Sequence, residues 1–361
     1  MPIITSRVSV TLLVLPRIPN SVGVADIDNG ALEVWLERHV AGFSGPLTIN
    51  KFDSGQSNPT YRIDTPSGTV VLRRKPFGAL LPSAHAIERE YRVMAALQPF
   101  SFPVPRVIAL CEDAGVIGAP FYLMSMVGGK NFTDGALPGM TKGSRTALYY
   151  ALVDNLAALH CIDPEAAGLG TFGRPGNFFE RQVARWIKQY RASETERMDD
   201  MERLIAWLPA TLPAQSGISV VHGDYRIDNV IMDPAGGRIA AVLDWELSTL
   251  GDPLADFTYF LMNWVTPYDG RSSLQGLDLV ALGIPTLGEM TARYCAKAQR
   301  APIDNLDWYF AFNCFRVVGI AQGIKKRVMD GNASNSRATD LASRLPAMAA
   351  LAWSFAVRTG A

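Results

Sequence analysis

Three oxygen-bearing side chains and one arginine are concentrated in residues 220–230 and 241–246. Asp224, Arg226 and Asn229 share the first segment, and Asp244 follows Asn229 by fifteen residues, at the end of an apolar run. Phosphoryl transfer needs such a set: a carboxylate that accepts a hydroxyl proton, an amide and a second carboxylate that hold Mg²⁺, and a cation near the moving phosphoryl group. We therefore predict that Asp224 is the catalytic base and that Asn229 and Asp244 bind the metal.

Arg226 and His222 stand on either side of the predicted base. Two roles fit Arg226: it neutralises charge on the transferring phosphoryl group, or it forms a salt bridge within the loop. We expect His222 to order the loop through hydrogen bonds, because no further His or Cys stands nearby to complete a zinc site. Asp256 we expect to bind backbone N–H groups of the same loop. For Asp244 the plainer alternative is an aspartate that caps the turn after a strand.

The pattern His-x-Asp-x-x-x-x-Asn resembles the catalytic loop of kinases, in the His-Gly-Asp form of the aminoglycoside phosphotransferase and choline kinase family. Asp244 stands where kinases carry the aspartate of Asp-Phe-Gly, although Trp245 and Glu246 follow it here. The resemblance implies an α+β, bilobal protein kinase-like fold, with a small β-rich N-lobe and a larger, mostly helical C-lobe. It also implies ATP and Mg²⁺ as cofactors.

Hydrophobic periodicity and turn residues predict the elements that must position these side chains. A poorly specified extension, 1–30, precedes an N-lobe at 31–127 and a C-lobe at 128–361. In the N-lobe we expect helices at 31–44 and 84–97 and strands at 47–52, 60–63, 69–73, 107–111 and 121–126. In the C-lobe we expect helices at 146–160, 178–190, 198–208, 254–264, 287–298, 306–328 and 338–357, and strands at 219–221, 230–232 and 239–243.

The predicted N-lobe supplies candidates for nucleotide binding. Ser57 and Asn58 lie in a turn that we expect to cover the phosphates with backbone N–H groups and the Ser57 hydroxyl. Arg73 ends the third strand, where kinases place a lysine, and Glu90 on the next helix is its expected partner. An arginine there is a departure, because a planar fork replaces a point charge, and Arg74 or Lys75 are alternatives.

The hinge between the lobes is the expected site of adenine recognition. It comprises Met124, Ser125, Met126 and Val127, whose backbone groups would read the base. An ordinary apolar strand end is the alternative interpretation of this segment.

Composition narrows the class of partner. Lys+Arg and Asp+Glu both number 34, so the chain has no net charge. This argues against nucleic-acid or membrane-surface binding by bulk electrostatics. The four cysteines stand far apart in sequence, which favours free thiols in the cytoplasm. No segment approaches transmembrane length, and we expect a monomer or a homodimer.

The acceptor is expected to be a small molecule. Only eleven residues separate Asp244 from Asp256, too few for the activation segment with which protein kinases dock a peptide. Residues 52–61, 71–76, 84–91 and 315–327 resemble the kinase domains fused to acyl-CoA dehydrogenases. That resemblance implies phosphorylation of the hydroxyl group of a hydroxyacyl-CoA.

A late basic cluster is compatible with such a substrate. Arg316, Lys325, Lys326 and Arg327 are expected on one helix, where they would contact CoA phosphates; a solvated basic helix end is the alternative. Trp186 and Tyr190 would line the acceptor pocket or, at their helical spacing, pack in the core. Two other functions stay open: an aminoglycoside- or choline-type phosphotransferase, and a nucleotide-binding scaffold without catalysis.

Overall fold

The computed structural model describes residues 27–52, 58–77, 86–233, 237–330 and 344–361. An antiparallel five-stranded sheet with the order β1-β2-β3-β5-β4 dominates the N-terminal part. Its elements are α1 (Asn29–His39), β1 (Thr48–Lys51), β2 (Thr60–Thr65), β3 (Gly68–Arg74), α2 (Ile87–Leu97), the 3₁₀ turn η1 (Gln98–Phe100), β4 (Val107–Cys111) and β5 (Phe121–Ser125).

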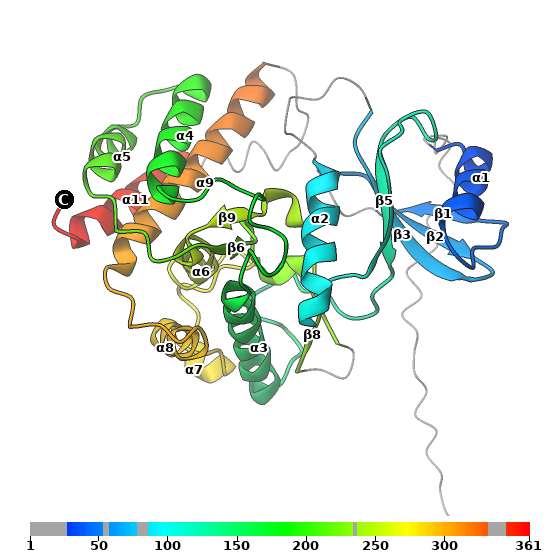
Figure 1. Ribbon diagram of the computed structural model, residues 1–361. Helices are drawn as coiled ribbons and strands as arrows, with labels where there is room; N and C mark the ends of the chain where they lie inside the picture. The colour runs from blue at the N-terminus through cyan, green and yellow to red at the C-terminus, as the bar shows by residue number, and fades with distance from the viewer. Residues whose placement is uncertain (1–26, 53–57, 78–85, 234–236, 331–343) are drawn as a thin grey trace, which may run out of the picture.

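The two faces of this sheet carry different helices. Alternate residues of a strand point to opposite faces, so Leu72 and Leu123 pack in one hydrophobic cluster with α1. Their neighbours Val71 and Tyr122 belong to the larger cluster that contains the apolar side chains of α2. Figure 1 shows α2 between the sheet and the helical part of the molecule. The helix that carries Glu90 therefore contacts both parts.

The C-terminal part is mostly helical. Its helices are α3 (Lys142–Cys161), α4 (Phe178–Ser193), α5 (Asp199–Ala210), α6 (Pro253–Leu261), α7 (Leu279–Leu282), α8 (Leu287–Lys297), α9 (Leu306–Met329) and α11 (Leu345–Arg358). Two small antiparallel sheets pair β6 (Ser219–Val221) with β9 (Thr249–Gly251) and β7 (Val230–Met232) with β8 (Ile239–Val242). The 3₁₀ turns are η2 (Ile227–Asn229), η3 (Trp245–Leu247) and η4 (Met262–Trp264).

The predicted α+β architecture is confirmed, with differences at element ends. The first helix stops at His39, because the chain soon reaches Gly42 at a φ of +76°, outside the helical region. The predicted helix 254–264 is α6 followed by the separate turn η4. The predicted helix 338–357 appears as α11, with 338–343 outside the described residues, as are 84 and 85. The short β9 and α7 were not predicted.

Arginines of α2 hold the two parts together. Arg89 donates from Nη2 to the carbonyl oxygens of Phe172 at 2.7 Å and Ser248 at 3.2 Å. Ser248 directly follows η3, the turn that begins after Asp244. The helix that positions Glu90 is thus fastened to the segment that carries the second predicted metal ligand.

Candidate active site

The backbone of the catalytic loop is held by a buried carboxylate. Asp256 accepts from the backbone N–H of His222 at 2.6 Å and of Gly223 at 2.9 Å, as expected from the sequence. Burial alone would raise the pKa of Asp256, but its contacts with His160 and His222 hold that pKa below its ordinary value. Gly223 has a φ of +86°, and a Cβ there would lie 2.7 Å from the Leu247 carbonyl oxygen. The loop therefore needs both this acid and a glycine.

His222 connects the catalytic loop to the metal loop. Its Nε2 donates to the Leu243 carbonyl oxygen at 2.8 Å, and its Nδ1 accepts from the Asp224 N–H at 3.2 Å. The ring is fully buried and lies against Trp245, with ring centroids 4.6 Å apart. His222 therefore orders the loop, which is the role expected for it.

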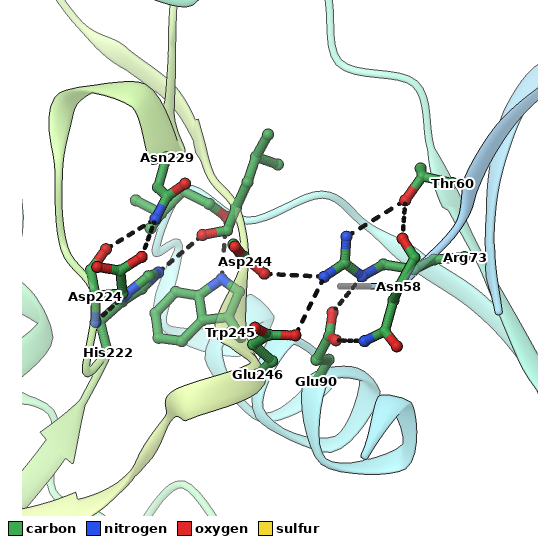
Figure 2. Close-up of polar contacts among 12 residues, drawn as sticks. Asn58, Thr60, Arg73, Glu90, His222, Asp224, Asn229, Asp244, Trp245 and Glu246 are labelled. Carbon is green, nitrogen blue, oxygen red and sulfur yellow. Dashed lines mark hydrogen bonds and ion pairs between the residues drawn. The ribbon is translucent and has the colours of Figure 1, made fainter. Parts of the chain in front are cut away.

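Both oxygens of Asp224 have protein donors. Tyr259 donates its hydroxyl to Oδ1 at 2.7 Å, and Asn229 donates from Nδ2 to Oδ2 at 3.1 Å. The same Asn229 nitrogen donates to the Asp224 carbonyl oxygen at 2.9 Å. The amide nitrogen of Asn229 is thus used twice within the loop, and its amide oxygen takes part in neither bond. Figure 2 shows Asn229 above Asp224 and His222.

Asp244 lies between the catalytic loop and the N-terminal sheet (Figure 2). Its backbone has a φ of 64° and a ψ of 60°, a left-handed conformation that is uncommon for residues other than glycine. This conformation turns the chain from β8 into η3. Its Oδ1 accepts from Arg73 Nη2 at 2.9 Å, and a third of the side chain is exposed. Such strain is common at functional sites.

Arg73, and not Arg74 or Lys75, forms the predicted pair with Glu90. Its Nε lies 2.8 Å from Glu90 Oε2, and its Nη1 donates to the Thr60 hydroxyl at 3.3 Å. Arg74 is buried on another side and donates to Tyr61, while Lys75 pairs with Glu88. The expected Arg73–Glu90 pair is therefore present.

Glu90 is almost fully buried, and its carboxylate contacts three polar side chains. Asn58 donates to its Oε1 at 2.8 Å and Tyr122 to its Oε2 at 3.0 Å, in addition to Arg73. Burial, with the nearby charge of Asp244, raises the pKa of Glu90 to about 7 against the opposing effect of Arg73. Asn58 belongs to the turn that was predicted to cover the phosphates with backbone N–H groups. Its side chain is buried against Glu90, because a buried carboxylate needs donors.

The four predicted hinge residues divide into two groups. Met124 and Ser125 belong to β5 and pair with β3. Met126 and Val127 follow the last paired residue, so the sheet does not use their backbone groups, and the Met126 side chain is exposed. Ser57 lies outside the described residues. Of the four predicted hinge residues, Met126 and Val127 thus lie beyond the pairing of β5 with β3, and adenine recognition by the segment stays a prediction.

Comparison with known proteins identifies the chain. The profile described as the phosphotransferase enzyme family (APH) matches residues 48–289. The chain belongs to this phosphotransferase family. The predicted enzyme class, a phosphotransferase for a hydroxyl acceptor, is confirmed by that membership.

Two curated relatives carry acyl-CoA dehydrogenase names. Acyl-CoA dehydrogenase family member 10 of Mus musculus is 46% identical over 92% of this chain, and family member 11 of Homo sapiens is 37% identical over 88%. The aligned regions cover 32% and 43% of those two proteins, so the chain spans less than half of their length.

Solved structures confirm the protein kinase-like fold. A protein of Ralstonia eutropha JMP134, provisionally named an aminoglycoside phosphotransferase, superposes with a TM-score of 0.85 at 46% identity, covering 92% of this chain and 99% of that one. A choline kinase of Cryptosporidium parvum Iowa II superposes with a TM-score of 0.61 at 10% identity, over 92% of this chain and 97% of its own, which concerns the fold alone.

In this phosphotransferase, Arg226 makes the loop contacts that were its alternative role. Its Nη2 donates to Asp228 at 2.7 Å, and its Nε lies 3.5 Å from Asp224 Oδ1. Burial lowers the pKa of Arg226, but Asp224, Tyr259 and Asp228 together raise it above its ordinary value. Arg226 therefore stays charged beside the predicted base.

Arg316 of the phosphotransferase lies on the other side of the catalytic loop. Its Nη2 donates to the Gly223 carbonyl oxygen at 2.7 Å. Its guanidinium lies 4.8 Å from the ring centroid of Tyr259 and 5.7 Å from that of Trp186. Trp186 and Tyr190 are both buried in the hydrophobic core, which favours the packing interpretation for them.

The predicted basic cluster does not act as one group. Lys325 follows Arg316 by nine residues, or two and a half helical turns, so it lies on the opposite face of α9. There it pairs with Glu196 at 2.6 Å. Lys326 pairs with Asp330 at 3.5 Å. Arg327 is exposed and lies three helical turns beyond Arg316, on the same face of α9. Within the described residues, neither Arg316 nor Arg327 forms an ion pair.

Sequence reasoning missed Tyr259. A signal was available, because Tyr259 follows Asp256 by three residues and so lies on the same face of α6, toward the loop.

In the described part of the phosphotransferase, no helix is both long and apolar enough to cross a bilayer.

Proposed function

We propose that this phosphotransferase transfers the γ-phosphoryl group of ATP to the hydroxyl group of a hydroxyacyl-CoA, with Mg²⁺ as cofactor. The observation that carries the proposal is the convergence of Asp224, Asn229 and Asp244 opposite Arg73 (Figure 2). The donor set fits Mg²⁺, because the Asn229 amide oxygen and the Asp244 carboxylate are hard oxygens. When bound, the ion would neutralise phosphate charge.

The proposed reaction needs the protein to do two things: to accept one proton and to stabilise the charge on the phosphoryl group. The acceptor oxygen forms a bond to the γ-phosphorus while the bond from phosphorus to the bridging oxygen of ADP breaks. The acceptor proton passes to Asp224, whose orientation two donors fix. Arg226 stands 3.5 Å from Asp224, where its charge supports the transferring phosphoryl group. Arg73 supports the nucleotide phosphates from the N-lobe side.

Two arginines support a CoA thioester as the acceptor. Arg316 contacts the catalytic loop, and Arg327 lies about 16 Å further along the same face of α9 at 1.5 Å per residue. Gly323 lies between them, and a Cβ there would meet no atom within 4 Å. A hydroxyacyl-CoA has this layout, with the reacting hydroxyl and the phosphates at opposite ends of a long linker. The names of the curated relatives support the same class.

An acceptor screen tests the proposal. Purified full chain with Mg²⁺-ATP is offered 3- and 4-hydroxyacyl-CoAs, their unhydroxylated acyl-CoAs, free CoA, aminoglycosides and choline. ADP release and a phosphorylated product by mass spectrometry are expected only with hydroxyacyl-CoAs. Arg327→Ala should raise the KM for that substrate and leave the KM for ATP unchanged, while Lys326→Ala serves as the matched control. Turnover with cationic acceptors alone would reject the CoA thioester.

The second candidate is an aminoglycoside phosphotransferase. It is supported by the name given to the Ralstonia eutropha structure, at 46% identity. Aminoglycosides are cationic, however, and two arginines, Arg226 and Arg316, flank the loop of the predicted base. Like charges at the acceptor side disfavour such a substrate, so the same screen separates the two candidates.

A further inference from the structure

Tyr259 touches the predicted base from a different element. It lies on α6, and its hydroxyl donates to Asp224 Oδ1 at 2.7 Å. We propose that Tyr259 is a positioning residue that fixes the rotation of the Asp224 carboxylate, so that an incoming hydroxyl meets it in one direction. The inference rests on the proposed role of Asp224 as the base.

A carboxylate on a short side chain has a soft terminal torsion. The last torsion of aspartate is broad and roughly two-fold, so one hydrogen bond fixes it poorly. Here Asn229 holds Oδ2 from within the loop and Tyr259 holds Oδ1 from α6. Two donors on opposite oxygens, from separate elements, define the plane of the carboxylate. Such pre-organisation matters for transfer, because small misplacements of a reacting group are costly in rate.

The tyrosine is itself held in place. Arg316 lies over its ring at 4.8 Å and donates to the Gly223 carbonyl oxygen, so α6, α9 and the catalytic loop are joined at this point. Burial and the charge of Asp224 raise the pKa of Tyr259, against Arg316 and Arg226. The hydroxyl therefore keeps its proton at neutral pH and remains a donor.

A purely structural tyrosine would behave differently. If the hydroxyl only needed a partner for its own burial, its loss would lower stability without a specific effect on turnover. If it positions the base, its loss lowers kcat and leaves nucleotide binding unchanged, because the residue proposed for the nucleotide, Arg73, pairs with Glu90 in the N-lobe. The split between kcat and KM therefore separates the two roles.

The test compares three full-length proteins: wild type, Tyr259→Phe, and Tyr149→Phe as the matched control. Tyr149 is buried and, like Tyr259, donates its hydroxyl; its acceptor is the Gly135 carbonyl oxygen at 2.6 Å, away from the site. We expect Tyr259→Phe to lower kcat on the order of 10- to 100-fold with the KM for ATP within about twofold. Tyr149→Phe should keep the wild-type kcat. Incorporation of 4-aminophenylalanine at 259, which restores a donor, should recover much of the loss.

The outcomes separate a failure of the positioning role of Tyr259 from a failure of the proposed function. Rates are measured with the acceptor that the screen identifies and without acceptor, where water takes its place. Wild-type activity on a non-CoA acceptor would reject the proposed substrate and leave the tyrosine test intact. Equal kcat for wild type and Tyr259→Phe, or no recovery with the amino analogue, would overturn the positioning role alone. A wild-type chain that consumes ATP in neither assay would overturn both.

Discussion

A single arginine sets the geometry of the nucleotide side. The planar guanidinium of Arg73 reaches Glu90, Thr60 and Asp244 at once. The point charge of a lysine cannot reproduce that fork. Burial lowers the pKa of Arg73, but the charges of Glu90, Asp244 and Glu246 raise it above its ordinary value, so the residue stays charged.

Arg73→Lys should therefore be a harmful change. It retains the charge but loses bonds to Glu90 or Asp244, and we expect the KM for ATP to rise about tenfold. Steady-state kinetics over a range of ATP concentrations measures the effect. Arg62→Lys, at an exposed position of the neighbouring strand β2, is the control and should be silent. A wild-type KM in Arg73→Lys would show that the fork is dispensable.

Among single residues, those that belong to a local motif could be predicted from the sequence. Residues whose contacts depend on the tertiary fold could not. Asp224, Asn229 and Asp244 converge as expected, and Arg73 pairs with Glu90. Spacing along the chain cannot reveal what a side chain meets across the fold. For that reason neither the contact of the Asn58 side chain with Glu90 nor that of Tyr259 with Asp224 was predicted.

Among the elements, the catalytic loop depends on its support by α6 and η3. Asp256 of α6 binds two loop N–H groups, and Gly223 packs against Leu247 of η3. Because the loop has almost no regular structure of its own, these contacts define its shape. The three-residue strand β9 was not predicted, since it ends in a glycine, a residue depleted in strands, although it pairs with the strand that leads into the loop.

Gly223→Ala tests the close approach of the loop to η3. The alanine would need a positive φ and would place Cβ 2.7 Å from the Leu247 carbonyl oxygen. We expect a loss of about 3 kcal/mol in the free energy of unfolding, together with most activity. The control is Gly237→Ala, which has a similar φ of +82° but no atom within 4 Å of the added Cβ. That variant should lose only about 1 kcal/mol and keep its activity; equal losses would refute the steric argument.

Asp256→Asn tests the support from α6 and has a defined pH dependence. The folded pKa of Asp256 lies below its ordinary value of 3.8. The carboxylate thus contributes stability that is complete above that value and is lost as the pH falls through the folded pKa. We expect the variant to lose about 3 kcal/mol in urea unfolding between about pH 6 and pH 8, with a smaller deficit below about pH 4. A deficit that grows on acidification would contradict the assignment.

At the scale of the whole molecule, the candidate active site lies where the two parts meet. Arg73 comes from the sheet and Asp244 from the helical part, and Arg89 fastens α2 to both Phe172 and Ser248. The bilobal fold was predictable because strands and helices separate along the sequence. The relative position of the lobes was not, since it depends on contacts between residues far apart in the chain.

The central claim, that Asp224 serves as the base between these parts, is tested most directly by Asp224→Asn. Initial rates of ADP release and of phosphorylated product are measured beside Asp233→Asn, a partly buried carboxylate paired with Arg238. We predict that Asp224→Asn lowers kcat on the order of 10²- to 10⁴-fold and binds ATP as the wild type does, while Asp233→Asn is fully active. A fully active Asp224→Asn would contradict the account.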